Sequence, residues 1–458
     1  MIQNQSQDNQ PIHRILSEYY KTPAFFTGTV HCEASGNGSG FFRLGPDIVC
    51  YGECSTGVAA DVENSGSCDA HRALQVSKSG LHLPFHVDRV IDDLRMEHYV
   101  GHLSADEKRL VQSKIIRRAY YLVRAPLPIW VRRHLQRAYF RDWQKLSFPH
   151  WPIDTTVDSL HELILRLAMQ AQGCRKVPFI WFWPKGAPGC VILTHDVETA
   201  AGRDFAPTLM DIDEAHGFKA SFQVVPEKRY EITDKLVLDI QDRGFEFNIH
   251  DLNHDGHLFE DKDEFLVRVA KINKYGKKYG ARGFRSGAMY RNQDWLDAFD
   301  FSYDMSVPNV AHFEPQRGGC CTVMPYFNGR ILELPLTTSQ DYTVFHILNE
   351  QVIDLWKKQI NLIRQKHGLL SFLSHPDYLI DSGCRAIYSS LLVHLRQMVY
   401  QEGLWTALPG EVDRWWRARA DMKIVPDGDT WRIEGPQSEQ ASIAYAMLDG
   451  DHIIYALK

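Results

Sequence analysis

Short apolar runs alternate with amphipathic stretches from residue 176 to residue 405, and this alternation constrains the fold more than any other feature. Runs typical of buried strands stand at 179–183, 191–194, 220–225, 245–249, 283–285, 331–336 and 369–373. Helical spacing of apolar residues occurs at 206–216, 233–243, 262–279, 350–367 and 385–402. Alternating strands and helices favour an α/β fold with a mostly parallel sheet, and the distance between successive strands fits a (β/α) barrel.

The segments on either side of this region have different patterns. Within residues 1–175, Gly/Ser-rich sequence with short apolar runs at 30–100 is followed by helical stretches rich in arginine and aromatic residues. Residues 411–458 contain a charged helical stretch and then short strand-like runs separated by Asp-Gly turns. We therefore predict three parts: a mixed α+β extension at 1–175, the barrel at 176–410, and a small helix and β appendage at 411–458.

The charge of the chain gives no reason to expect a nucleic-acid partner, because 51 basic and 57 acidic residues give a net charge of -6, and we predict none. No apolar run approaches the roughly 18 residues of a membrane-spanning helix. The polar start of the sequence lacks the basic and apolar segments of a signal peptide, so we expect a cytoplasmic protein. The stretch at 117–143 is expected to be a helix pair with solvent-facing arginines. Peripheral association with the inner face of the membrane is the open alternative.

Histidines and carboxylates follow three of the predicted strands. Asp196 and Glu198 end the first of them, His250 and His254 follow another, and His375 follows the last. Two histidines four residues apart and one carboxylate form a three-ligand metal site that leaves a coordination position open, as catalytic zinc sites do. Alternate residues of a strand point the same way, so one acid can bind metal while the other acts as general base. This pattern predicts metal-assisted hydrolysis.

These segments resemble the motifs of the polysaccharide deacetylases, carbohydrate esterase family 4. The counterparts, in the order of that family, are 194–198, 250–254, 283–287, 301–304 and 372–375. The resemblance implies a distorted (β/α) barrel of the polysaccharide deacetylase type and a divalent metal, with zinc as the first expectation. It also implies that the substrate is an N-acetylated sugar or glycan.

The resemblance also assigns roles to individual residues. It makes Asp196 the catalytic base and Glu198, His250 and His254 the metal ligands. It further gives Arg285 the task of orienting the base, Asp304 that of supporting the late histidine, and His375 that of protonating the leaving amine. Tyr290 and Tyr326, in loops after strands, are candidates to bind the sugar, and Trp295 and Tyr342 have similar positions.

The sequence departs from the family pattern at several positions. Val197 separates the two acids that usually stand side by side, so the opposite assignment stays open, with Asp196 as ligand and Glu198 or His195 as base. Ser286 replaces a proline, and Asp251 replaces a serine or threonine. Two other functions also stay open: a hydrolase of small cyclic amides or ureides on the same fold, and a non-catalytic glycan-binding or scaffold protein.

Overall fold

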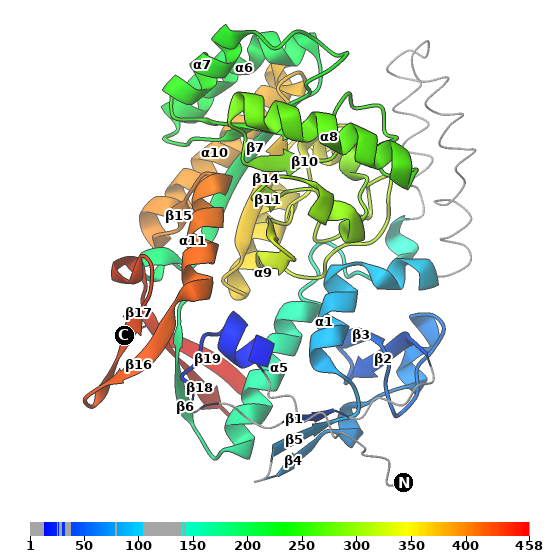
Figure 1. Ribbon diagram of the computed structural model, residues 1–458, viewed down its shortest axis with the longest axis vertical. Helices are drawn as coiled ribbons and strands as arrows, with labels where there is room; N and C mark the ends of the chain where they lie inside the picture. The colour runs from blue at the N-terminus through cyan, green and yellow to red at the C-terminus, as the bar shows by residue number, and fades with distance from the viewer. Residues whose placement is uncertain are drawn as a thin grey trace. The chain divides into compact units, whose positions relative to one another are not determined.

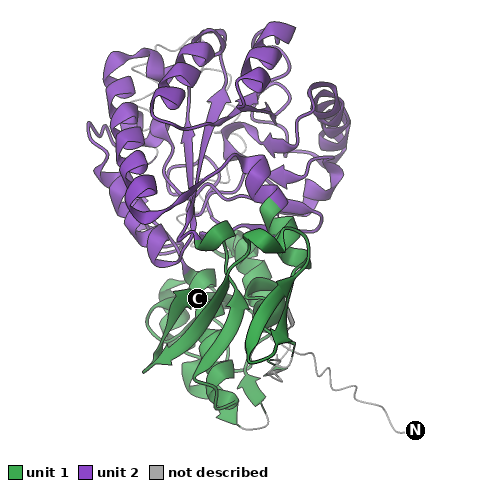
Figure 2. Ribbon diagram, turned by 90° about the vertical axis from the view of Figure 1, so that its left-hand side faces the viewer, with its two compact units in different colours: residues 1–103, 156–186, 415–458 green, residues 104–155, 187–414 purple. Residues whose placement is uncertain are grey.

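The computed structural model describes residues 13–24, 26, 30–32, 38–77, 80–103, 140 and 143–457. The chain divides into two compact units, coloured separately in Figure 2. Unit 1 contains residues 1–103, 156–186 and 415–458, and unit 2 contains residues 104–155 and 187–414. The chain therefore contributes three separate segments to unit 1, a different grouping from the three consecutive parts expected from the sequence. The arginine- and aromatic-rich stretch at 117–143 lies outside the described residues apart from Phe140 and Trp143.

The described residues of unit 1 form several small sheets and a few helices. One sheet joins β6 (Lys176–Ile180), β18 (Ile443–Asp449) and β19 (His452–Leu457), all antiparallel. The run at 179–183 was expected to begin the barrel but belongs to this sheet and the turn after it. The remaining elements of unit 1 are β1 (Val30–Cys32), β2 (Gly40–Leu44), β3 (Ile48–Gly52), β4 (Gln75–Ser77), β5 (Gly80–Leu83), α1 (Val87–Arg95), α5 (Thr156–Ala171), β16 (Lys423–Asp427) and β17 (Thr430–Glu434).

Unit 2 is built on one large mixed sheet (Figure 1). Its strand order is β12-β13-β11-β10-β9-β8-β7-β14, and β15 also pairs with β7. All pairings are parallel except that of β12 with β13. The strands are β7 (Cys190–Val197), β8 (Ser221–Val224), β9 (Glu246–His250), β10 (Gly283–Arg285), β11 (Tyr303–Asp304), β12 (Tyr326–Asn328), β13 (Ile331–Glu333), β14 (Leu369–Ser374) and β15 (Trp405–Thr406). The α/β class is confirmed.

The strand pairings in the described part of the chain form an open path from β12 to β14 rather than a closed ring. The segment after β13 nevertheless reaches β14 through hydrogen bonds. Thr337 Oγ1 donates to the Leu369 carbonyl, and Thr338 Oγ1 donates to the Ser371 carbonyl. The backbone amide of Thr338 also donates to Ser371. These contacts place residues 337–341 alongside β14, and His375 follows directly after that strand.

Helices connect the strands of unit 2 and bury their outward-facing side chains. They are α6 (Ala200–Ala215), α7 (Asp234–Asp242), α8 (Lys262–Tyr279), α9 (Asp354–Gln365), α10 (Ser382–Glu402) and α11 (Pro409–Asp421), whose end enters unit 1. Asp261 caps α8 by accepting from the amides of Asp263 and Glu264, and Gly280 ends it in a left-handed conformation. No helix in the described ranges is both long and apolar enough to span a membrane.

Candidate metal centre and its acid–base groups

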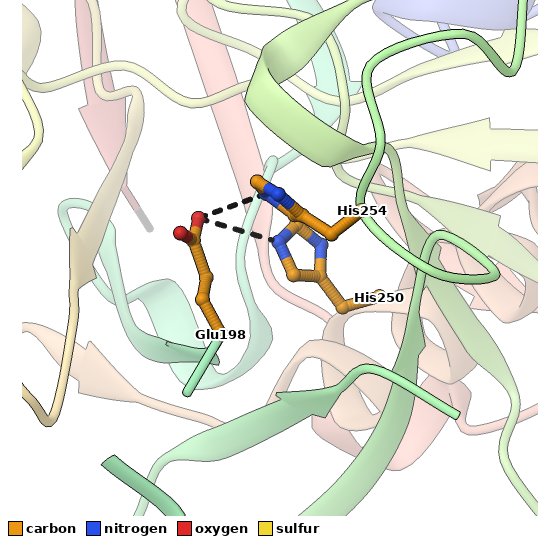
Figure 3. A group of neighbouring side chains, drawn as sticks. All are labelled: Glu198, His250 and His254. Atoms are coloured by element: carbon orange, nitrogen blue, oxygen red, sulfur yellow. Dashed lines mark ion pairs between the residues drawn. The ribbon is translucent and has the colours of Figure 1, made fainter. Parts of the chain in front are cut away.

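Glu198, His250 and His254 converge on one point at the carboxyl ends of β7 and β9 (Figure 3). One ligand atom from each lies within 4.8 Å of the others. His254 Nε2 is 2.9 Å and His250 Nε2 is 3.7 Å from Glu198 Oε1. Burial alone would raise the pKa of Glu198, but the neighbouring histidines, His254 first, hold it well below its usual value. The carboxylate is therefore ionised, as a metal ligand must be.

The two histidine rings present buried nitrogen atoms that a cation could bind. Nε2 of His250 and Nε2 of His254 are both buried, and neither makes a well-aligned hydrogen bond among the described residues, although the Glu198 carboxylate lies close to both. A buried polar atom without a partner is costly and calls for an explanation, and a metal ion supplies one. Nδ1 of His250 donates to the Arg285 carbonyl over 3.1 Å, and in the neutral ring this tautomer leaves Nε2 as the nitrogen that can bind a metal. Two imidazoles and one carboxylate suit a divalent transition metal such as zinc.

The loop that carries His254 is held in an unusual backbone conformation. Asp251 and His254 have φ values of 56° and 55°, in the left-handed region that non-glycine residues rarely adopt. Arg229 secures this loop by donating to the carbonyls of Asn253 and His254 over 3.2 and 2.5 Å. Its Nη2 also lies 3.3 Å from Nδ1 of His254, so the guanidinium contacts the ring as well as the backbone. No feature of the sequence pointed to Arg229.

Asp196 lies beside the three ligands but is held by a different partner. Its Oδ1 accepts from Arg285 Nη1 over 2.9 Å, and its Oδ2 is 3.6 Å from His250 Nε2. Arg285 is fully buried and also donates to Thr194 Oγ1 and the Met305 carbonyl, each over 2.9 Å. Burial favours a raised pKa for Asp196, but Arg285 above all, then His250 and His375, lower it. Asp196 is thus an ionised carboxylate that can accept a proton.

His195 lies on the opposite side of β7 from Asp196, as the alternation of a strand requires. Its Nε2 is 2.9 Å from Asp213 Oδ2 on α6, and its Nδ1 is 2.9 Å from Ser374 Oγ. Tyr388 on α10 donates to the other oxygen of Asp213 over 2.7 Å. The histidine therefore belongs to a buried network beneath the helices and is turned away from the metal ligands.

His375 approaches the centre from the end of β14. Its Nε2 is 3.4 Å from Glu198 Oε1, and its Nδ1 donates to Asp341 Oδ1 over 2.7 Å. The backbone amide of His375 donates to the other oxygen of Asp341, also over 2.7 Å. Burial favours a lower pKa for His375, but Asp341 and then Glu198 raise it well above its usual value. His375 is consequently protonated near neutral pH and ready to donate from Nε2.

The carboxylate that supports His375 is therefore Asp341, which corrects the expectation placed on Asp304. Asp304 ends β11 and accepts instead from the hydroxyl of Ser306 over 2.7 Å. The contacts of residues 337 and 338 with β14 explain the difference, because they carry Asp341 to the end of that strand. An acidic residue soon after the apolar run at 331–336 was the available sequence signal.

The two tyrosines expected to bind sugar are buried. Tyr290 is 7% and Tyr326 is 4% exposed, and the hydroxyl of Tyr326 donates to Gln293 Oε1 over 2.9 Å. Neither ring offers a free face, so that expectation is corrected. The half-buried aromatics beside the centre are Tyr378, whose ring centroid lies 4.9 Å from that of His375, and Tyr342, 5.9 Å from Tyr378.

A search of protein-family models finds no match to this chain. A search of curated proteins finds none either. Similarity is found among solved structures, of which we report three.

A polysaccharide deacetylase from Mycobacterium smegmatis has 17% identity and a TM-score of 0.41, covering 51% of this chain and 92% of its own. A family 4 carbohydrate esterase from Streptomyces lividans, in complex with acetate, has 12% identity and a TM-score of 0.31, covering 48% and 93%. A family 4 pseudoenzyme from Bacillus anthracis has 16% identity and a TM-score of 0.31, covering 50% and 66%. The chain is thus similar to polysaccharide deacetylases of known structure. At these identities and TM-scores, the similarity does not identify its activity.

Proposed function

We propose that this chain is a metal-dependent hydrolase that removes acetyl groups from an N-acetylated sugar or glycan. One observation supports the proposal: three residues that could hold a cation, an ionised carboxylate and a protonated histidine lie at the same edge of the sheet. Asp196 lies 3.6 Å from His250, and His375 lies 3.4 Å from Glu198. A base and an acid next to a Lewis-acid site are the groups that amide hydrolysis requires.

The residues divide the chemistry between them. A divalent cation held by Glu198, His250 and His254 would polarise the amide carbonyl and lower the pKa of water. Asp196 accepts the proton of the attacking water, and Arg285 keeps the carboxylate in position. His375 then donates its Nε2 proton to the amide nitrogen, so that the C–N bond breaks and the amine leaves in neutral form. Acetate and the free amine are the products.

The completeness of this set favours an enzyme over a non-catalytic glycan-binding or scaffold protein. A site that had lost its activity would be expected to lack its base or its acid. Here the candidate base Asp196 is hydrogen-bonded to Arg285, and the candidate acid His375 is hydrogen-bonded to Asp341. The same groups could hydrolyse a small cyclic amide, so the substrate must be decided by experiment.

The first test is metal content and acetate release by the purified protein. We expect about one divalent ion per chain, as one three-ligand site allows, and its loss in His250→Ala/His254→Ala. We also expect release of acetate from at least one of a panel of N-acetylated sugars and oligomers, abolished in the double variant. Asp242→Asn, on the exposed end of α7, is a matched control that should keep both properties. Bound metal without acetate release from any N-acetylated sugar would contradict the proposal.

A further inference from the structure

Two acidic side chains, Asp304 and Glu333, lie side by side in the large sheet and take no part in the chemistry proposed above. They are paired positions on the parallel strands β11 and β13, and their carboxyl groups are hydrogen-bonded to each other. Both are buried, with 2% and 0% of their surface exposed. Two carboxylates repel one another and neither has a donor, so a hydrogen bond between them requires that one holds a proton.

The remaining contacts of the two side chains indicate which of them holds that proton. Asp304 accepts with both oxygens, from the hydroxyl of Ser306 over 2.7 Å and from its amide over 3.2 Å, which stabilises a carboxylate. Oε1 of Glu333 accepts from the Val307 amide over 3.0 Å, but its buried Oε2 has no donor among the described residues. Burial, and then the charge of Asp304, also raise the pKa of Glu333 well above its usual value. Glu333 is therefore the protonated partner.

The same contacts hold the turn that follows β11, because the two carboxyl groups together bind the backbone of residues 306 and 307. The neighbouring Met305 carbonyl accepts from Arg285 Nε over 2.9 Å, and Arg285 Nη1 donates to Asp196 over 2.9 Å. Nη2 of Arg285 is buried and has no partner among the described residues. The guanidinium thus depends on its other contacts for its orientation, and the Met305 carbonyl is one of them.

We propose that Asp304 and Glu333 share one proton and act as a positioning pair for the catalytic base, because they fix the turn whose carbonyl directs Arg285 towards Asp196. The inference rests on the proposed function, in which Asp196 is the base. Sharing a proton leaves the pair with one negative charge instead of two. A second charge near Arg285 would compete with Asp196 for the guanidinium, since Glu333 lies within electrostatic reach of Arg285.

The shared proton can be detected without any measurement of activity. Infrared spectra of the unmodified protein and of Glu333→Gln, recorded at neutral pH, should differ by the carbonyl band of a protonated carboxyl group, present only in the unmodified protein. Asp242→Asn removes an exposed carboxylate of α7 and should leave that band in place. Identical spectra in this region for the unmodified protein and Glu333→Gln would overturn the shared proton.

The positioning role is tested by comparing Glu333→Gln with Glu333→Met. Glutamine reproduces the protonated acid, since its amide group can donate to Asp304 and its oxygen can accept from Val307, whereas methionine fills similar space without either contact. In metal-loaded Glu333→Met we expect kcat for acetate release to fall about 10- to 100-fold and KM to change less than about threefold, because a displaced base slows the chemical step more than binding. Glu333→Gln should keep kcat at least about tenfold above that of Glu333→Met, with metal content equal in both.

Equal kcat in the two variants, or a loss that falls on KM alone, would overturn the positioning role. The infrared comparison does not need the methionine variant, so it decides the shared proton even if Glu333→Met fails to fold. If the unmodified, metal-loaded protein releases acetate from no substrate, the proposed function fails and the positioning role fails with it. That outcome is distinct from an active protein in which Glu333→Met leaves kcat unchanged, which overturns the positioning role alone.

Discussion

Replacing Asp341 by asparagine tests the acid–base arrangement most directly. Asp341 is fully buried and binds His375 twice, at the ring Nδ1 and at the backbone amide, both over 2.7 Å. Asparagine has the same size but only one oxygen, so it can accept from one of these donors and must turn its own N–H groups towards the other. The substitution therefore removes a charge and one hydrogen bond while leaving no cavity.

The size of the effect follows from the bond that is lost. A hydrogen bond to a charged group contributes about 1.5–3 kcal/mol, so kcat/KM should fall about 10- to 150-fold. The pH profile should change as well. His375 must be protonated to act as acid, so activity falls as the pH rises through its pKa, which Asp341 raises. Without that charge the pKa decreases and the basic limb of the profile moves to lower pH, whereas the acidic limb, set by Asp196, stays in place.

The assay is acetate release measured across pH, with metal content and thermal stability determined in parallel. Asp242→Asn, an exposed aspartate on α7, serves as the control for a loss of one negative charge. A purely structural role for Asp341 would lower activity equally at every pH without moving the basic limb. Unchanged activity, or an unmoved limb with metal still bound, would refute the assignment of His375 as the acid supported by Asp341.

Three further substitutions separate metal binding, base catalysis and stability. Asp196→Asn should keep the metal and lower kcat about 100-fold or more, because general-base catalysis is lost; metal loss by elemental analysis would instead identify Asp196 as a ligand. Gly287→Ala would place a Cβ 2.5 Å from Asp251 Oδ2 and 3.0 Å from His254 Cδ2. We expect it to weaken metal affinity about tenfold by calorimetry, and unchanged affinity would contradict the tight packing of this loop. Phe284→Ala should lower the free energy of unfolding by about 3–5 kcal/mol in a denaturant titration, since the ring is buried against Phe299; a loss below about 1 kcal/mol would contradict that packing.

Much of unit 2 could be predicted from the sequence because parallel strands that are buried on both faces consist of continuous apolar runs. Six of the seven predicted runs coincide with strands of the large sheet. The seventh, at 179–183, failed because an apolar run does not reveal which sheet it will join. β6 pairs with β18, a partner distant in the sequence, and that pairing leaves no local signal.

The candidate site was predictable to a similar degree. Residues that end or directly follow a strand, such as His250, Glu198 and His375, could be placed because the carboxyl ends of parallel strands meet at one edge of the sheet. Asp341 could not, since its position depends on the hydrogen bonds of the preceding threonines with β14. Arg229 acts through backbone carbonyls, and such contacts are invisible in a residue pattern. The sequence thus indicated the positions of the proposed reacting groups better than those of the residues that hold them.

The pairing of β6 with β18 also bears on how this protein can be shortened. β6 precedes residues 187–414, the larger segment of unit 2, and its hydrogen-bonding partner β18 follows that segment. A chain ending after α11 would keep every residue of the candidate site but leave the β18 edge of β6 without a partner. Exposed strand edges of apolar sequence pair readily with other chains, so such a fragment should aggregate even where the free protein does not. Separating the two units will require joining the distant segments of unit 1 by circular permutation rather than removing residues from either end.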